Sequence, residues 1–273
     1  MNLLKLVESF DQQIKSYSDE KSSLENRRSF VKTAYQVPAK AILATLSAAL
    51  FVTPKSVRAQ SGDPIMDVLN FALTLEYLED DFYKMALDAN NLIPGDDKRI
   101  FMQISKHETA HVEFLKSALG ANAVAKPEFD FTAGGQFPGA FTDYMTFLTL
   151  SQAFEDTGVR AYKGQAGNLM TNDTVLTQAM QIHSVEGRHA AEVRWLRAEV
   201  TDNGVKPWIE NNAAYDAPQA VYDGEENIVH AGVDLNSIES IASIGNNVKS
   251  RAFDEPLTKE QVMAIVSPFI KAS

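Results

Sequence analysis

Apolar residues recur every three or four positions in four long stretches of the chain. This spacing places them along one face of an α-helix, so each stretch is predicted to be an amphipathic helix. Pro64 suits a first helical turn, and Gly120 suits a helix end. The predicted helices cover residues 64–90, 96–119, 141–164 and 174–200. The pattern therefore indicates an all-α protein.

The connections between these helices are expected to differ in length. Residues 120–140 are rich in Gly, Pro and Ala, which disfavours a helix there and leaves a long link between the second and third helices. A four-helix bundle with one long crossover is a standard arrangement, and we assign it to residues 60–200. Residues 201–273 look irregular, with a short helix near residues 256–266 closing the chain. We expect this C-terminal extension to pack on the bundle.

The first 59 residues have the features of an export signal. Residues 26–32, which contain Arg27 and Arg28, resemble the twin-arginine export motif. An apolar run of 12 residues, 41–52, follows it and is short of the roughly 20 that a membrane-spanning helix needs. Small residues then lead to Ala59. We expect residues 1–59 to be a twin-arginine signal peptide, cleaved near Ala59 after passage through the twin-arginine translocase, which leaves a periplasmic or extracellular protein.

Composition narrows the possible chemistry. The chain has no cysteine, which excludes disulfides, iron–sulfur clusters, cysteine zinc sites and thiol nucleophiles. Its formal net charge is −11, and its basic residues form no cluster along the sequence. Binding to phosphates needs clustered Lys and Arg, so no nucleic-acid partner is expected.

Ionisable residues interrupt the apolar stripes at matching places. In the second predicted helix Glu108 and His111 lie three positions apart and so share one face. Glu186 and His189 repeat that spacing in the fourth helix. A single glutamate lies on the stripe of each remaining helix, Glu76 in the first and Glu155 in the third. Burying so many carboxylates is costly unless cations lie between their oxygens.

The two halves of the predicted bundle repeat each other. Glu108 follows the first-helix glutamate by 32 positions, and Glu186 follows the third-helix glutamate by 31. In each half a tyrosine, Tyr83 or Tyr162, lies seven positions after that glutamate, about two helical turns, and so on the same face. The repeat also favours Glu76 over Glu79 as a ligand, because Glu79 would correspond to a glycine in the other half.

One glutamate from each of two helices, combined with Glu-x-x-His from each of the other two, is a known ligand set for di-iron and dimanganese sites in helix bundles. Carboxylate-rich ligation with one imidazole per metal suits iron(II) or manganese(II). We therefore predict two Fe or Mn ions per chain. Glu76 and Glu155 are the expected terminal ligands. Glu108 and Glu186 are expected to bridge the two ions, and His111 and His189 to provide one imidazole per metal.

Four segments resemble the ferritin-like domain family of exported bacterial proteins, which also contains plant desiccation-related proteins. They are residues 69–79, 107–115, 154–162 and 185–191, and residues 253–270 resemble the family's C-terminus. The resemblance implies a ferritin-like bundle with a dimetal site, and it implies little about the substrate.

Several functions remain open at this stage. A dimetal oxidoreductase of ferroxidase, peroxidase or catalase type would act on oxygen, peroxide or Fe(II), with Tyr83 and Tyr162 as catalytic hydrogen-bond donors or electron relays. An iron-storage cage, and a non-catalytic stress or structural protein on the same scaffold, are alternatives. Homo-oligomerisation is compatible with each of these.

A zinc peptidase is a further alternative. His107-Glu108-x-x-His111 matches the motif in which two histidines bind zinc and a glutamate acts as general base. That interpretation leaves the other predicted ligands and both tyrosines without a role. If the protein is not a zinc peptidase, His107 is expected either to support a metal ligand or to lie at the surface. The same two roles are expected for His183, whereas His230 is expected to be structural.

Overall fold

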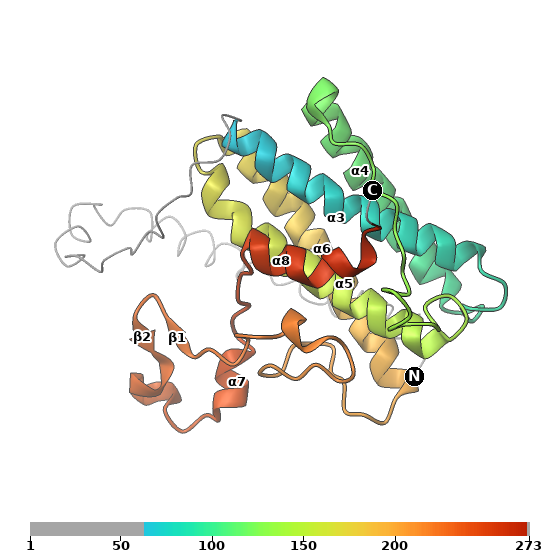
Figure 1. The fold of residues 1–273 in the computed structure, drawn as a ribbon. Coiled ribbons are helices and arrows are strands. Elements are labelled where there is room, and N and C mark those ends of the chain that lie inside the picture. The colour runs from blue at the N-terminus through green and yellow to red at the C-terminus, as the bar shows by residue number, and fades with distance from the viewer. Residues whose placement is uncertain (1–62, 272–273) are drawn as a thin grey trace, which may run out of the picture. The chain divides into compact units, whose positions relative to one another are not determined.

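The structure is a computed structural model, and it describes residues 63–271 of the 273-residue chain. Its core consists of four long helices. They are α3 (Pro64–Asp88), α4 (Lys98–Leu119), α5 (Tyr144–Gln165) and α6 (Asp173–Val200). Helix α3 packs on α4, and α5 packs on α6, so that two helical hairpins form one bundle (Figure 1). The predicted all-α four-helix bundle is confirmed.

Side-chain caps account for where three of the helices begin. The carboxylate of Asp63 accepts a hydrogen bond from the Ile65 backbone N–H at the start of α3. Asp143 caps α5 and Asn172 caps α6 in the same way. Such caps satisfy backbone N–H groups that have no partner within the helix. Helix α5 begins three residues later than the apolar pattern predicts, because Asp143 takes the capping position.

The long crossover lies between α4 and α5, over residues 120–143. It begins at Gly120, whose positive φ of 54° ends α4. The crossover runs beside the C-terminus of the chain. The backbone N–H of Asp130 donates to the carbonyl of Phe269 at 2.8 Å, and that of Lys271 donates to Glu128 at 2.9 Å. These bonds explain how an irregular segment keeps one path over the bundle.

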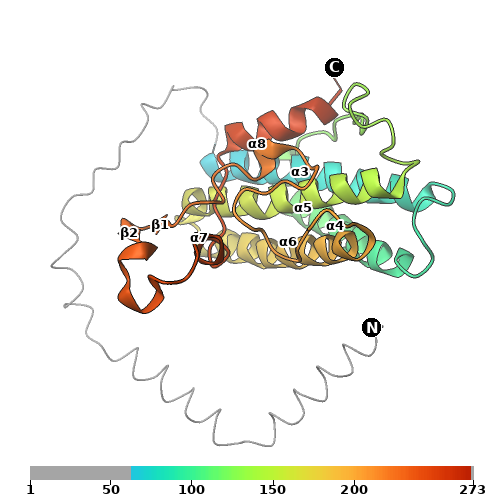
Figure 2. The same ribbon diagram turned by 90° about the horizontal axis from the view of Figure 1, so that it is seen from below.

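The C-terminal extension contains only short elements. A two-stranded antiparallel ribbon, β1 (Val229–His230) and β2 (Val233–Asp234), precedes α7 (Asn246–Ser250) and α8 (Lys259–Val266). Helix α8 confirms the predicted closing helix and packs on α5, as Figures 1 and 2 show. Single 3₁₀ turns complete the described chain: η1 (Gly120–Asn122), η2 (Ala166–Leu169), η3 (Gln219–Val221), η4 (Leu235–Ser237), η5 (Glu239–Ile241) and η6 (Ser267–Phe269).

Buried arginines of the bundle tie the extension to it. Arg160 on α5 forms an ion pair with Glu225 at 2.9 Å and donates to backbone carbonyls of Val221, Asp223 and Glu255. On α6, Arg194 and Arg197 are also buried, and their hydrogen-bond acceptors include Trp208 and Tyr215 of the extension. A buried charge is tolerated only when it is paired and hydrogen-bonded. The bundle therefore depends on the extension to satisfy these guanidinium groups.

The backbone of the extension also approaches α5 very closely at Gly164. A Cβ atom at this position would lie 1.9 Å from the carbonyl oxygen of Leu257. The backbone N–H of Leu257 donates to the Arg160 carbonyl at 3.2 Å, which fixes the approach. Only glycine leaves room for this contact.

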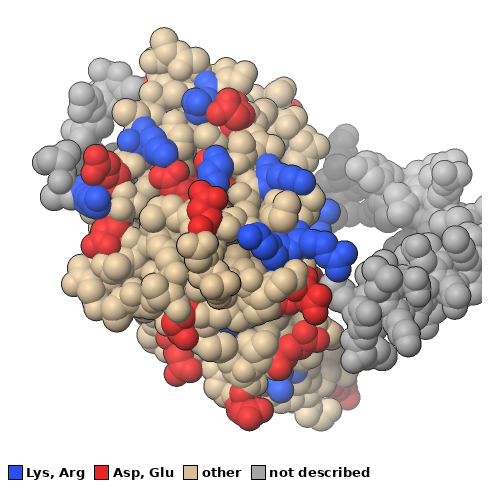
Figure 3. Space-filling view, turned by 90° about the vertical axis from the view of Figure 1, so that its right-hand side faces the viewer, with Lys and Arg blue, Asp and Glu red and all other residues tan. Residues whose placement is uncertain are grey.

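The predicted signal peptide, residues 1–59, lies outside the described residues. Within residues 63–271, no helix is both long enough and apolar enough to cross a membrane. On the face drawn in Figure 3, acidic and basic side chains of the described residues are interspersed. Exposed ion pairs such as Lys116–Glu113 add little stability, so the bundle is held mainly by its buried contacts.

Gly164→Ala should destabilise the fold, because the new methyl group meets the Leu257 carbonyl. We expect a loss of about 1–3 kcal/mol in the free energy of unfolding, as for other overpacked sites. Gly187→Ala in α6 is the matched control. Apart from its chain neighbours and the nearby backbone of α6, no described atom lies within 4 Å of a Cβ there. Replacing a mid-helix glycine should therefore stabilise by about 0.5–1 kcal/mol. Urea unfolding measures the free energy of unfolding of both variants. Equal changes in the two variants would contradict the close approach of Leu257 to Gly164.

Candidate metal centre

Six ionisable side chains meet in the middle of the bundle. All are buried, and they come from every one of the four long helices. They are Glu76 on α3, Glu108 and His111 on α4, Glu155 on α5, and Glu186 and His189 on α6. We call these six residues the cluster. The structure thus brings together all six residues that the sequence proposes as ligands.

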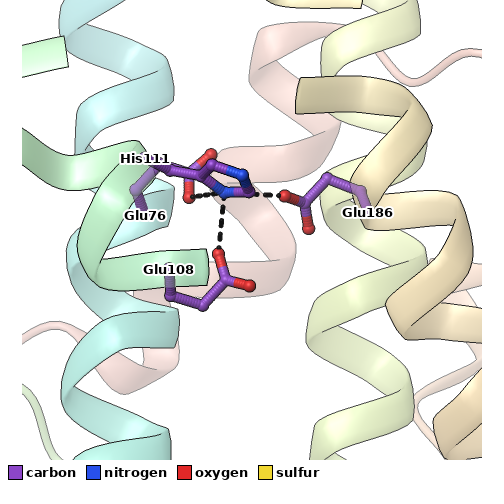
Figure 4. Close-up of side chains that lie close together, drawn as sticks. All are labelled: Glu76, Glu108, His111 and Glu186. Atoms are coloured by element: carbon purple, nitrogen blue, oxygen red, sulfur yellow. Dashed lines mark hydrogen bonds and ion pairs between the residues drawn. The ribbon is translucent and has the colours of Figure 1, made fainter. Parts of the chain in front are cut away.

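The first half of the cluster surrounds His111. Its Nδ1 atom lies 3.1 Å from one carboxylate oxygen of each of three glutamates, Glu76, Glu108 and Glu186 (Figure 4). These glutamates come from three different helices. The Glu-x-x-His spacing positions Glu108 and His111 on one helix face, and the bundle supplies the other two carboxylates.

The second half surrounds His189. Its Nδ1 atom lies 2.8 Å from Glu108, 3.3 Å from Glu155 and 3.9 Å from Glu186. Glu108 and Glu186 therefore face both imidazoles. Each half offers four ligand atoms, one per residue, that lie within 4.8 Å of one another. The cluster thus contains two adjacent positions for an ion, with two carboxylates shared between them.

Several buried polar atoms of the cluster lack a hydrogen-bond partner among the described residues. They are Oε1 of Glu108, Oε2 of Glu155, both carboxylate oxygens of Glu186, and Nδ1 of His189. The close contacts that these atoms make with the imidazoles lack hydrogen-bonding geometry. The atoms therefore face one another without a hydrogen-bond partner. Unpaired buried carboxylates are costly, whereas cations between them would satisfy every one of these atoms. Four carboxylates with two imidazoles fit two iron or manganese ions.

Two tyrosines hold the outer glutamates. Tyr83 Oη donates to Glu155 Oε1, and Tyr162 Oη donates to Glu76 Oε1, each at 2.5 Å. Each tyrosine therefore contacts the glutamate of the opposite half and not the one that precedes it in the sequence. This exchange arises because α3 and α5 run in opposite directions (Figure 1). Burial, and then the adjacent carboxylate, raise the pKa of both tyrosines well above the usual value, so both remain donors.

Without metal, protons stabilise the cluster. Burial raises the pKa of Glu108 to about 7, although its contacts with the two imidazoles oppose the shift. Burial and neighbouring carboxylates raise the pKa of Glu186 well above its usual value. Burial disfavours the charged form of His189, but the carboxylates of Glu155 and Glu108 outweigh it and raise its pKa to about 11. Protonated imidazoles thus supply positive charge, and protonated carboxyl groups reduce the negative charge that cations would otherwise balance.

His107, for which the sequence allows either a supporting or a surface role, lies against the cluster. Its Nδ1 atom lies 2.8 Å from Nε2 of His189, and the two rings stack with centroids 5.1 Å apart. On its other side, Nε2 of His107 lies 2.7 Å from the side-chain nitrogen of Gln103. A contact of this kind orients an imidazole ligand and sets which nitrogen faces a metal.

The other two histidines lie away from the cluster. Nδ1 of His183 is 3.0 Å from the backbone carbonyl oxygen of Val159. The ring of His230 in the extension stacks on Phe253, with Glu255 at 3.4 Å. Their contacts are those of structural residues.

Glu79 lies beside the cluster, although sequence comparison of the two halves sets it aside. It is buried, and a Cβ atom at Gly158 would lie 3.2 Å from its carboxylate and 3.4 Å from that of Glu186. Burial, and then the charges of Glu186 and the other cluster glutamates, raise the pKa of Glu79 well above its usual value. The glycine at position 158 could have indicated this in the sequence. Because Gly158 has no side chain, it leaves room in the third helix for the carboxylate of Glu79 from the first.

Comparison with known proteins identifies the family of this bundle. Residues 65–199 match a family described as "Ferritin-like domain". Among curated proteins, none matches the chain significantly. The matched span contains the whole cluster, both tyrosines and nearly all of α3 to α6. Residues 65–199 of this chain therefore form a ferritin-like domain.

Proposed function

We propose that the cluster holds two iron or manganese ions and that the protein is a redox enzyme of the ferroxidase or peroxide-consuming type. The observation that carries this proposal is the pair of overlapping buried groups that share Glu108 and Glu186. Two adjacent metal positions joined by shared carboxylates are the arrangement expected of a dinuclear centre. Its substrates would be oxygen or peroxide, or Fe(II).

Each cluster residue has a proposed role. Glu76 and Glu155 would be terminal ligands, and Glu108 and Glu186 would bridge the two ions. One imidazole, from His111 or His189, would complete each position. When bound, two redox-active ions would supply the two electrons that reduction of an O–O bond requires.

The other residues at the site prepare it for this chemistry. Tyr83 and Tyr162 orient the terminal carboxylates, and each holds a proton at its hydroxyl oxygen, 2.5 Å from a carboxylate. The near-complete burial of the cluster excludes bulk water. His107 limits the rotation of His189 through the contact between their ring nitrogens.

The zinc-peptidase alternative fits the geometry poorly. It requires His107 and His111 to bind one zinc ion. Within the described part of the chain, His107 belongs to neither group of potential ligands and contacts Gln103 and His189 instead. A non-catalytic stress or structural protein remains the main alternative, and turnover of peroxide or Fe(II) distinguishes it from an enzyme.

We further propose that the protein is exported by the twin-arginine translocase and cleaved near Ala59. This route carries folded proteins, so the metals could be loaded inside the cell. Mass spectrometry of the protein from its own cells tests the cleavage, since the mature chain would begin at Gln60.

Metal binding and protonation should compete at the cluster. The pKa of Glu108 in the folded protein, about 7, exceeds the value of about 4.3 for an unfolded glutamate. The metal-free folded state therefore binds more protons than the unfolded chain between these values, and its stability falls as pH rises through them. His189 acts in the same direction, because its stabilising proton is fully bound below about 6.5 and is lost as pH rises towards 11.

The melting temperature of the metal-free protein should therefore fall between pH 5 and pH 8.5. Adding Mn(II) should raise it, and the increase should grow with pH, because the ions replace protons on the ligands. Differential scanning calorimetry with and without Mn(II) measures this. Ionisable groups far from the cluster affect the melting temperature equally with and without Mn(II). The difference between the two melting temperatures therefore reports metal binding at the cluster. A difference that is independent of pH would argue against metal binding at these residues.

Elemental analysis should find about two iron or manganese ions per chain in protein purified from its own cells. Glu108→Ala and Glu186→Ala should each remove most of this metal, because both positions share these carboxylates. Glu113→Ala is the control, since Glu113 is an exposed glutamate of α4 and should not affect metal content. Full metal content in either cluster variant would disprove the assignment, and one zinc ion per chain would favour a peptidase.

Tyr83→Phe and Tyr162→Phe should retain the metals and slow turnover of peroxide or Fe(II) by about 10–100-fold, as loss of hydrogen bonds to ligands commonly does. Tyr77→Phe is the control on α3, because its hydroxyl contacts only the Val124 carbonyl, at 3.5 Å, among the described residues. Stopped-flow assays on metal-loaded protein measure the rates. Equal rates in the parent protein and the three variants would show that neither Tyr83 nor Tyr162 has a catalytic role.

A further inference from the structure

An apolar cavity of about 340 Å³ lies between the four long helices at one end of the bundle. Its walls come from the first half of α3, the end of α4, the end of α5 and the start of α6. Valine, leucine, isoleucine, phenylalanine and alanine make up most of the lining, and none of the described residues that line it carries a charge.

The cavity occupies the layer of the bundle next to the cluster. Three of its lining residues each lie four positions from a cluster residue on the same helix: Ala72 before Glu76, Leu115 after His111, and Ile182 before Glu186. Four residues correspond to about 6 Å along a helix. A molecule in the cavity would therefore lie about one helical turn from the candidate metal positions.

Tyr162 belongs to both sites. Its side chain lines the cavity, and its hydroxyl donates to Glu76 Oε1 at 2.5 Å. The ring thus forms the partition between the cavity and the half of the cluster around His111. An occupant of the cavity would contact this ring.

Besides Tyr162, three polar residues, Gln165, Thr174 and Gln178, lie among the apolar lining residues. Thr174 is exposed and Gln178 is half-buried at the start of α6, whereas Ala179, Ile182 and Tyr162 are buried. Ligand pockets typically combine an apolar interior with a few polar groups that orient the ligand. Thr174 and Gln178 would therefore lie beside the polar end of a ligand at the start of α6.

We propose that this cavity binds an uncharged apolar organic molecule next to the cluster. An apolar cavity of about 150 Å³ accommodates benzene, so the volume here suits two fused rings or a chain of roughly ten carbons. The lining has no cationic side chain to pair with a carboxylate, so the ligand is a hydrocarbon or an alcohol and not a fatty acid. Binding depends on the cavity alone and does not require metal.

Fluorescence titration of the full chain with N-phenyl-1-naphthylamine tests the proposal. We expect saturable binding of one probe per chain in the absence of metal. 1-Decanol should displace the probe at a concentration at least ten-fold lower than decanoate. Absence of saturable binding would overturn the proposal. One probe per two chains, lost when the protein is diluted, would also overturn it by assigning the site to an interface between copies.

Ala179→Phe should fill the cavity and weaken probe binding at least ten-fold. Ala191→Phe is the matched control, because Ala191 is an exposed residue of the same helix and should leave binding unchanged. Unchanged binding in Ala179→Phe would place the probe elsewhere and overturn the proposal. If that variant fails to fold, Ala179→Leu should show weaker binding together with a higher melting temperature, because it fills an empty space.

Metal content is measured on the same variants. The Ala179 variants should bind metal as the parent protein does, because the side chain is not a ligand. Loss of probe binding with full metal content would thus support the cavity proposal independently of the metal site. Conversely, Glu108→Ala should lose metal and retain the probe, which makes the failure of one proposal distinguishable from the failure of the other.

Discussion

The burial of four carboxylates in one small volume is the constraint on which the bundle depends. Glu76, Glu108, Glu155 and Glu186 cannot share the core as anions unless positive charge lies among them. In the absence of metal, protonated imidazoles provide positive charge and protonation of carboxylates reduces the negative charge. Two cations would balance the charge more completely. The helices must hold these groups at fixed distances, so the tight packing around them serves the cluster as much as it serves the fold.

The same electrostatic demand explains the C-terminal extension. Arg160, Arg194 and Arg197 are buried on the bundle helices, and carboxylates and carbonyls of the bundle and the extension accept their hydrogen bonds. The extension is irregular because its path follows these acceptors and the close approach at Gly164. The loops of the extension, together with η3, therefore complete the bundle's polar contacts.

The two halves of the cluster are related by a repeat, but they are not equivalent. His107 supports the imidazole of His189, whereas the apolar cavity lies behind Tyr162 and the half around His111. Glu79 fills the space that Gly158 leaves in the other half. Two metal ions bound here would accordingly have different surroundings, with a rigid contact on one side and an apolar space on the other.

The sequence alone determined the four helices, the long crossover and the six residues of the cluster. Apolar periodicity and Glu-x-x-His spacing are local properties, and a helix converts them directly into a shared face. Only the tertiary structure decided that each tyrosine holds the opposite glutamate, that His107 contacts His189, that Glu79 approaches the cluster, and where the extension and the cavity lie. These features depend on the direction and distance between helices far apart in sequence, which the periodicity of a single helix does not encode.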